Sequence, residues 1–142
     1  MSTKEREMRF REAVRYMENA SDILRRKAKK KNRYYEDEKH VRSSCAIAYK
    51  AVLLAAKTFL EINGELRRRK KYSRINENDL RIGLAKVDNN ILNEFKSAFA
   101  VLYRGGYYEG ECNYGYIQSG IDSAIHLINK IKPLGFESFK LN

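Results

Sequence analysis

The chain has 142 residues, 43% of them apolar and 33% charged, and its formal net charge at pH 7 is +11. This length fits one domain with a core of its own, and no apolar run approaches the ~20 residues of a membrane-spanning helix. The N-terminus is charged and lacks the apolar stretch of a secretory signal, and two cysteines make neither a disulfide framework nor a zinc site. We therefore expect one cytoplasmic domain over residues 1–142, with no metal and no cofactor.

The first two predicted helices show the clearest periodicity, and no strand pattern competes with them. Residues 4–29 carry apolar and small side chains at steps of three and four, which is the spacing of one helix face. A second helix begins after Asp37, a good N-cap, and ends at Asn63-Gly64. Two apolar stripes lie side by side along this helix, so we expect it to be buried on more than one side, at the centre of the molecule.

A short helical pattern over residues 80–87 precedes the third long helix. The pattern either continues into that helix or breaks at residues 88–90. The third long helix carries apolar residues from Ile91 to Leu102. We expect it to end at Gly105-Gly106, because glycine readily adopts the left-handed conformation found at helix ends.

The last helix covers the apolar repeat from Ile117 to Ile131 and is closed by Pro133. Gly120 within it costs about 1 kcal/mol of helix propensity relative to alanine, which a close helix crossing would explain. Short connections make successive helices antiparallel neighbours. The expected fold is therefore all-α: an antiparallel up-down four-helix bundle with a short extra helix between the second and third long helices.

Positive charge is concentrated in two blocks that hold 13 of the 29 basic residues and no acidic residue: residues 25–33, and residues 67–71 with Arg74. The other 16 basic residues nearly balance the 18 acidic ones. In the expected bundle the first block lies at one pole and the second at the opposite pole. Clustered cations repel one another, which a phosphate-rich partner would relieve, although solvated loops and helix C-termini also tolerate cations.

The loop after the third long helix returns to the pole of the first block and brings tyrosines with it. Tyrosine rings beside cations stack on nucleic-acid bases, and the same rings also cover a bundle end or form a dimer interface. Arg104 would anchor such a site, since its planar guanidinium can hold a phosphate or carboxylate through two hydrogen bonds. The candidate binding residues are Arg104, Tyr107, Tyr108, Tyr34, Tyr35, Arg25, Arg26 and Arg33.

Residues suited to catalysis are scarce. The two histidines lie on different predicted helices and belong to no recognisable metal or nucleophile motif. Cys45 falls on the apolar stripe of the second helix and is expected in the core, while Glu109 and Glu111 would disfavour the thiolate of the loop residue Cys112.

Several segments resemble the HEPN-like helical bundles (higher eukaryote and prokaryote nucleotide-binding domain). Residues 44–57 are similar to the alanine-rich second helix of that family with its internal tyrosine. Leu102-Tyr103-Arg104 followed by Tyr107-Tyr108 resembles the Leu-Arg and Asp-Tyr stretch after the third helix, and residues 117–131 match the last helix in pattern. More narrowly, the chain is similar to an uncharacterised group of small bacterial HEPN-like proteins.

The resemblance implies a function as well as a fold. Ribonuclease members of the superfamily carry an arginine followed after four to six residues by a histidine, near the junction of the third and fourth helices. Arg104 is the matching arginine, but residues 105–112 contain no histidine to serve as general base or acid. We therefore expect a non-catalytic binding or interaction module, a homodimer that engages nucleotide, RNA or an acidic protein partner.

Two alternatives remain open at this point. The first is a divergent metal-independent ribonuclease, because Arg33 and His40 have the required spacing, although at the junction of the first and second helices. The second is a protein-only partner of a small nucleotidyltransferase, a role that some HEPN proteins have.

Overall fold

The computed structural model describes residues 1–66 and 75–141, which are mostly helical. Two π-helical segments, η1 and η2, continue α1 and α4 directly. Within the described ranges, none of the helices combines the length and the apolarity that crossing a bilayer requires. In chain order the elements are α1 (Thr3–Ile23), η1 (Leu24–Ala28), β1 (Lys30–Lys31), β2 (Tyr34–Tyr35), α2 (Glu38–Ile62), α3 (Glu77–Val87), α4 (Asn89–Ala98), η2 (Phe99–Tyr108) and α5 (Tyr114–Lys130).

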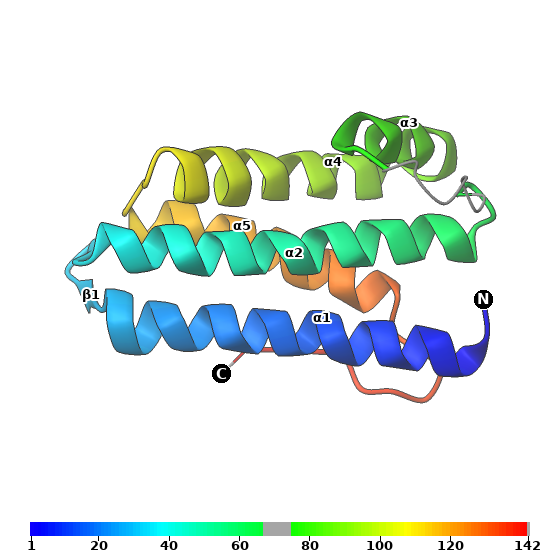
Figure 1. Ribbon diagram of the computed structural model, residues 1–142, viewed down its shortest axis with the longest axis horizontal. Coiled ribbons are helices and arrows are strands. Elements are labelled where there is room, and N and C mark those ends of the chain that lie inside the picture. The colour runs from blue at the N-terminus through cyan, green and yellow to red at the C-terminus, as the bar shows by residue number, and fades with distance from the viewer. Residues whose placement is uncertain (67–74, 142) are drawn as a thin grey trace.

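The long helices run side by side, and α2 lies at their centre. α1 with η1 runs toward one end of the molecule and α2 returns from it; α4 with η2 and then α5 repeat this reversal (Figure 1). α2 contacts α1, η1, α3, α4, η2 and α5. The prediction of a central second helix is therefore confirmed, as is a mainly helical fold. The second basic block, residues 67–71 with Arg74, lies outside the described residues.

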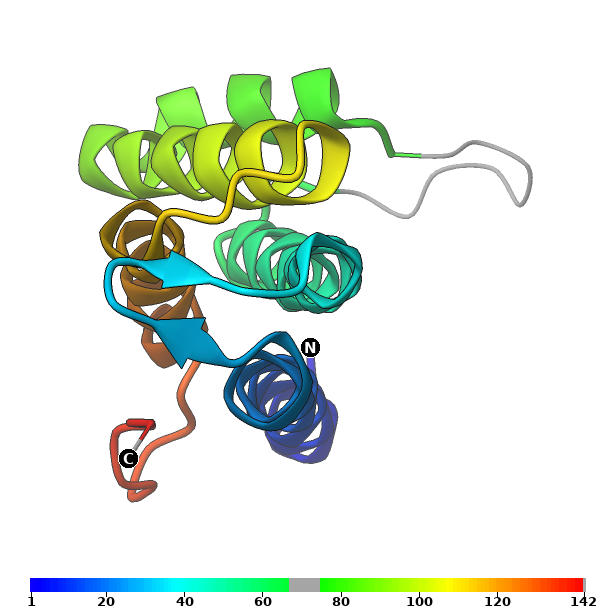
Figure 2. The same ribbon diagram turned by 90° about the vertical axis from the view of Figure 1, so that its left-hand side faces the viewer.

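The end of the molecule that carries the candidate binding site is called the hairpin end. It is formed by η1, the β1–β2 hairpin, the starts of α2 and α5, and the end of η2 (Figure 2). The hairpin pairs Lys30 with Tyr35 and Lys31 with Tyr34 in antiparallel register. Asn32 at its turn has φ 59°, a left-handed conformation that asparagine tolerates better than most residues. The sequence showed no strand pattern here, and these four residues add one short hairpin to an otherwise helical structure.

The pattern over residues 77–104 divides into two helices at Asp88. This residue has an extended backbone, with φ −161° and ψ 112°, which ends α3. Its carboxylate then accepts hydrogen bonds from the backbone N–H groups of Asn90 at 2.8 Å and Ile91 at 3.3 Å, so that it caps α4. One aspartate thus stops one helix and starts the next.

Gly105 and Gly106 do not end the third long helix, contrary to the prediction. Both lie buried inside η2, where a Cβ atom on Gly105 would lie 2.3 Å from the Tyr116 hydroxyl oxygen. A Cβ atom on Gly106 would lie 2.3 Å from the Cys45 sulfur. The turn comes at Gly110 instead, where φ is 71°. The glycine pair therefore serves close packing rather than helix termination.

Gly120 fulfils the role that was predicted for it. A Cβ atom at this position would lie 2.5 Å from Cγ1 of Val101 in η2, so the missing side chain lets α5 and η2 pack closely. The expected core position of Cys45 is also confirmed, because its side chain is fully buried. Burial raises the pKa of this thiol to about 12, so Cys45 remains a neutral packing residue.

The C-terminal tail folds back along α1 toward the hairpin end (Figure 1). The ring of Phe136 meets that of Phe10 edge-on at 5.8 Å between centroids, with the Arg11 guanidinium 4.9 Å from the Phe136 centroid. The Asn129 side chain holds Phe139 twice: its amide donates to the Phe139 carbonyl at 3.1 Å, and its oxygen accepts from the Phe139 N–H at 2.8 Å. The tail is thus attached to both α1 and α5.

We predict that Gly106→Ala lowers the free energy of unfolding by about 1–3 kcal/mol, because the new methyl group would lie 2.3 Å from the sulfur of the fully buried Cys45. Gly115→Ala is the matched control. Its Cβ atom would meet nothing nearer than 3.6 Å, so it should be neutral or should stabilise by up to ~1 kcal/mol. Urea unfolding followed by circular dichroism measures both values, and equal effects of the two substitutions would contradict the packing role.

Candidate binding site at the hairpin end

The hairpin is held in place by backbone hydrogen bonds to segments on either side of it. The N–H of Glu36 donates to the Lys29 carbonyl at 2.8 Å, which ties β2 back to the end of η1. The N–H of Tyr35 donates to the Cys112 carbonyl at 2.8 Å, and that of Tyr114 donates to the Arg33 carbonyl at 2.8 Å. These bonds fix the first basic block against the beginning of α5.

All seven cations of the first basic block are exposed, and they lie on or beside η1 and the hairpin. Among the described residues, Arg25 is the one cation of this block that forms an ion pair, with Asp22 at 2.8 Å. The Lys30 ammonium lies over the Tyr114 ring, 4.1 Å from its centroid, in a cation–π contact. The seven residues are Arg25, Arg26, Lys27, Lys29, Lys30, Lys31 and Arg33.

A pocket of about 610 Å³ opens between α1 with η1 and α5, beside the hairpin. Its volume is within the range typical of small-molecule sites. Apolar side chains from both helices and from the tail line it together with polar and charged ones. The lining residues are Ser21, Leu24, Arg25, Lys30, Tyr35, Tyr114, Gln118, Ile121, Asp122, Ile125 and Leu141.

Tyr35 forms part of the pocket wall and is only 5% exposed. The Gln118 side-chain amide donates to its hydroxyl oxygen at 3.1 Å, and its ring centroid lies 5.6 Å from that of Tyr114. Burial raises the pKa of Tyr35, so the phenol stays neutral and presents an apolar ring with one polar edge. Two of the predicted site residues, Arg25 and Tyr35, thus meet in one cavity.

Sequence reasoning missed the part of the pocket contributed by α5. Tyr114, Gln118 and Asp122 recur at four-residue steps and therefore share one face of that helix. This spacing was a usable signal. What it could not reveal is that Lys30 and Tyr35 face these residues, because their position depends on the unpredicted hairpin.

Arg104, Tyr107 and Tyr108 belong to η2, at the hairpin end but on the other side of the layer formed by α2 and α5 (Figure 2). The Arg104 guanidinium lies 5.6 Å from the Phe99 ring centroid. Phe99, Tyr103 and Tyr107 form a row of rings with centroid separations of 5.2 and 5.8 Å, which we call the aromatic row. The structure therefore separates Arg104 and these tyrosines from the first basic block and the pocket.

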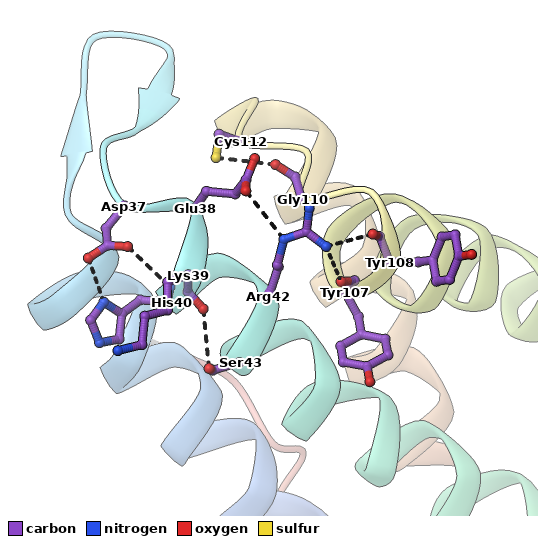
Figure 3. Close-up of polar contacts among 10 residues, drawn as sticks. All are labelled: Asp37, Glu38, Lys39, His40, Arg42, Ser43, Tyr107, Tyr108, Gly110 and Cys112. Carbon is purple, nitrogen blue, oxygen red and sulfur yellow. Dashed lines mark hydrogen bonds and ion pairs between the residues drawn. The ribbon is translucent and has the colours of Figure 1, made fainter.

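Arg42, which was not predicted, binds the end of η2 to the start of α2. Its Nη1 atom donates to the backbone carbonyls of Tyr107 at 3.1 Å and Tyr108 at 2.6 Å, and its Nε atom lies 3.4 Å from Glu38 (Figure 3). A cation in this position satisfies carbonyl groups that a helix end leaves unpaired. Gly110 leaves room for the contact, since a Cβ atom there would lie 2.7 Å from Nη2 of Arg42.

Asp37 and His40 form the other polar pair at the start of α2 (Figure 3). The Asp37 carboxylate accepts from the His40 N–H at 3.4 Å and lies 2.7 Å from Nδ1 of the His40 ring. The hydrogen bond from the ring lowers the pKa of Asp37. Asp37 therefore caps α2, as predicted, and also orients the imidazole. Arg33 lies in the hairpin turn, and its backbone carbonyl binds Tyr114.

Cys112 is half-buried, and its sulfur lies 3.4 Å from the Gly110 carbonyl oxygen. Burial raises the pKa of this thiol, and the charges of Glu38 and Glu111 raise it further. The neutral thiol is therefore favoured, as expected from the acidic neighbours, with Glu38 contributing rather than Glu109.

Comparison with known proteins identifies a family. Residues 8–133 match the family model described as "Domain of unknown function (DUF5618)". The chain belongs to this family. It is also similar to a solved structure, "protein of unknown function from Dyadobacter fermentans", with 28% sequence identity and a TM-score of 0.75 over 92% of this chain and 96% of that one. No curated protein matches the chain.

The DUF5618 chain has one strained residue next to its candidate site. Lys29, which joins η1 to β1, has φ 54° and ψ 123°, a conformation that glycine adopts more easily than lysine. We predict that Lys29→Gly raises the free energy of unfolding by about 1 kcal/mol, because relief of strain exceeds the added entropy of the unfolded chain.

The matched control is Lys31→Gly, which also removes one exposed cation from the first basic block but lies within β1. Glycine within a strand weakens it, so this variant should be less stable than the parent chain. Urea unfolding of both variants distinguishes the effects. Destabilisation by both substitutions alike would contradict strain at Lys29.

Proposed function

We propose that this DUF5618 chain is a non-catalytic, HEPN-like four-helix bundle whose hairpin end binds the phosphate groups of RNA or a nucleotide. The observation that carries the proposal is the exposure of all seven cations of the first basic block on one short η1–hairpin segment. Cations gathered in this way repel one another, and binding to a polyanion relieves that repulsion while releasing counterions.

Aromatic rings beside the cations favour nucleic acid over an acidic protein as the partner. Tyr34 in β2 is 54% exposed, and the pocket adjacent to the hairpin is lined by the rings of Tyr35 and Tyr114. Proteins that bind single-stranded nucleic acid combine cations that follow the backbone with rings on which bases stack. A single-stranded nucleic acid would use both features at once, the charges for its phosphates and the ring faces for its bases.

We infer a non-catalytic role from the residues around Arg104. Its guanidinium contacts the ring of Phe99, and no histidine follows it through residue 112. The ribonuclease alternative draws some support from the Asp37–His40 pair, because a carboxylate that orients an imidazole is a common feature of general bases. It stays the second candidate, with Arg33 of the hairpin turn as its cation.

We predict that the triple variant Arg26→Glu, Lys27→Glu and Lys31→Glu weakens binding to a labelled single-stranded RNA by at least about tenfold, because the lost cations no longer neutralise phosphates. The slope of log affinity against log salt should become shallower by about 2, since each phosphate contact with a single strand contributes about 0.7. Fluorescence anisotropy between about 50 and 200 mM salt measures both quantities.

The control for this experiment carries the same change of net charge elsewhere on the molecule. Arg15→Glu, Lys50→Glu and Lys96→Glu replace exposed cations of α1, α2 and α4. If this control weakens RNA binding as much as the hairpin variant, the affinity reflects net charge and the proposed site is wrong. The RNA should also be recovered intact; cleavage that disappears in His40→Ala would support the ribonuclease instead.

We further propose that the chain forms a homodimer through the face of η2 that carries the aromatic row. Within the row, Tyr103 is 39% exposed and Tyr107 is 44% exposed, and tyrosine is enriched at protein interfaces, where the ring is buried and the hydroxyl stays hydrated. Sedimentation equilibrium should give twice the chain mass of 16.6 kDa. Tyr107→Glu should shift the molecule toward the monomer, whereas the control Tyr34→Glu at the hairpin should remain dimeric.

A further inference from the structure

The pocket beside the hairpin is polarised along α5. The Lys30 ammonium lies over the ring of Tyr114, the first residue of α5, and Arg25 lines the same cavity. Asp122 lines it eight residues further along the helix, which corresponds to about 12 Å at 1.5 Å per residue. Within the described residues Asp122 belongs to no ion pair. A cationic end and an anionic end therefore face one cavity without neutralising each other.

We propose that this pocket binds a guanosine 5′-monophosphate group, either free or as the terminal nucleotide of an RNA. The inference rests on the proposed function in one respect, that the first basic block binds phosphate. The inference adds the identity of the base and the residues that would select that base. The phosphate lies between Lys30 and Arg25, the base lies along the apolar wall, and Asp122 binds the base edge.

The cationic end suits a phosphate monoester. Arginine presents a planar pair of donors and lysine a mobile point charge, and the two together match the tetrahedral oxygens of a dianion. Arg25 binds Asp22 at 2.8 Å, with both side chains largely exposed, so this contact is weak enough for a phosphate to replace it. Lys30 needs only to turn its ammonium from the Tyr114 ring toward the ligand.

The middle of the pocket suits a planar base. Leu24, Ile121 and the ring of Tyr35 are buried at its wall, and the half-buried Tyr114 ring gives it an aromatic side. A base can stack on such a ring, as bases do on the aromatic side chains of single-strand-binding proteins. The Gln118 amide, held by the Tyr35 hydroxyl, lies between the two ends on the same face of α5.

The carboxylate at the far end selects guanine among the common bases. An ionised carboxylate only accepts hydrogen bonds. Guanine offers it two adjacent donors, the ring N1–H and the exocyclic amine, in a bidentate arrangement. Adenine places an acceptor nitrogen beside its amine, and uracil places its single N–H between two carbonyls, so both repel one carboxylate oxygen. Asp122 should therefore favour guanine by about tenfold.

The test is a titration of the full chain with GMP, AMP, UMP and ribose 5-phosphate, monitored by NMR of backbone and side-chain amides. GMP should shift the Gln118 side-chain amide saturably and should bind about tenfold more tightly than AMP or UMP. Asp122→Asn should abolish this preference. Glu18→Gln, which removes an exposed carboxylate from α1 outside the pocket lining, should leave it unchanged.

A second matched pair tests the phosphate end. Lys30→Met removes a cation that lines the pocket and should weaken GMP about tenfold, as expected for a charge-assisted hydrogen bond. Lys96→Met removes an exposed cation of α4, which lies outside both the lining and the first basic block, and should change the affinity by less than about twofold. Equal effects of the two substitutions would overturn the assignment of the phosphate.

The inference fails if GMP produces no saturable shift of Gln118, or if ribose 5-phosphate binds as tightly as GMP. RNA binding distinguishes this failure from that of the proposed function. If RNA binds with a steep salt dependence while GMP leaves Gln118 unshifted, the pocket assignment alone is wrong. If GMP fills the pocket but reversal of the hairpin charges leaves RNA affinity unchanged, the RNA-binding proposal alone is wrong.

Discussion

The arrangement of the hairpin end depends on a pair of backbone hydrogen bonds, from Tyr35 to Cys112 and from Tyr114 to Arg33. They join a hairpin of two-residue strands, which would be too short to persist alone, to the segment that begins the last helix. Because of them, Lys30 lies over Tyr114 and Tyr35 faces Gln118. The cations and the helix face that together line the pocket come from residues more than eighty positions apart in the chain.

The two sides of the hairpin end differ in chemistry because different elements cover them. On the side of α1 and α5, cations from η1 and β1 border a cavity. On the side of η2, the aromatic row lies beside Arg104, and Arg42 is engaged with Glu38 and the end of the helix. A ligand that needs positive charge and a partner that needs aromatic area would therefore use separate surfaces, which allows both proposed interactions to occur in one molecule.

How well each feature could be predicted depends on how far apart in the sequence the interacting residues lie. The two apolar stripes of α2 and the cap at Asp37 are local patterns, and the structure confirms both. Gly120 was predicted correctly because a glycine inside a strongly periodic helix costs helix propensity that a close helix contact offsets.

Gly105-Gly106 gave the same local signal as a helix end, and only Tyr116 and Cys45, which are distant in sequence, reveal its packing role. The hairpin and the Arg42 contact were likewise invisible because their partners lie far along the chain.

The attachment of the C-terminal tail has a thermodynamic consequence for the pocket. Asn129 holds Phe139 through both of its amide atoms, and Leu141, two residues further on, forms part of the pocket wall. The chain therefore loses the conformational entropy of this wall when it folds, and not when a ligand binds. A preorganised cavity of this kind gives a ligand more of its contact energy as affinity than a cavity that must assemble around it.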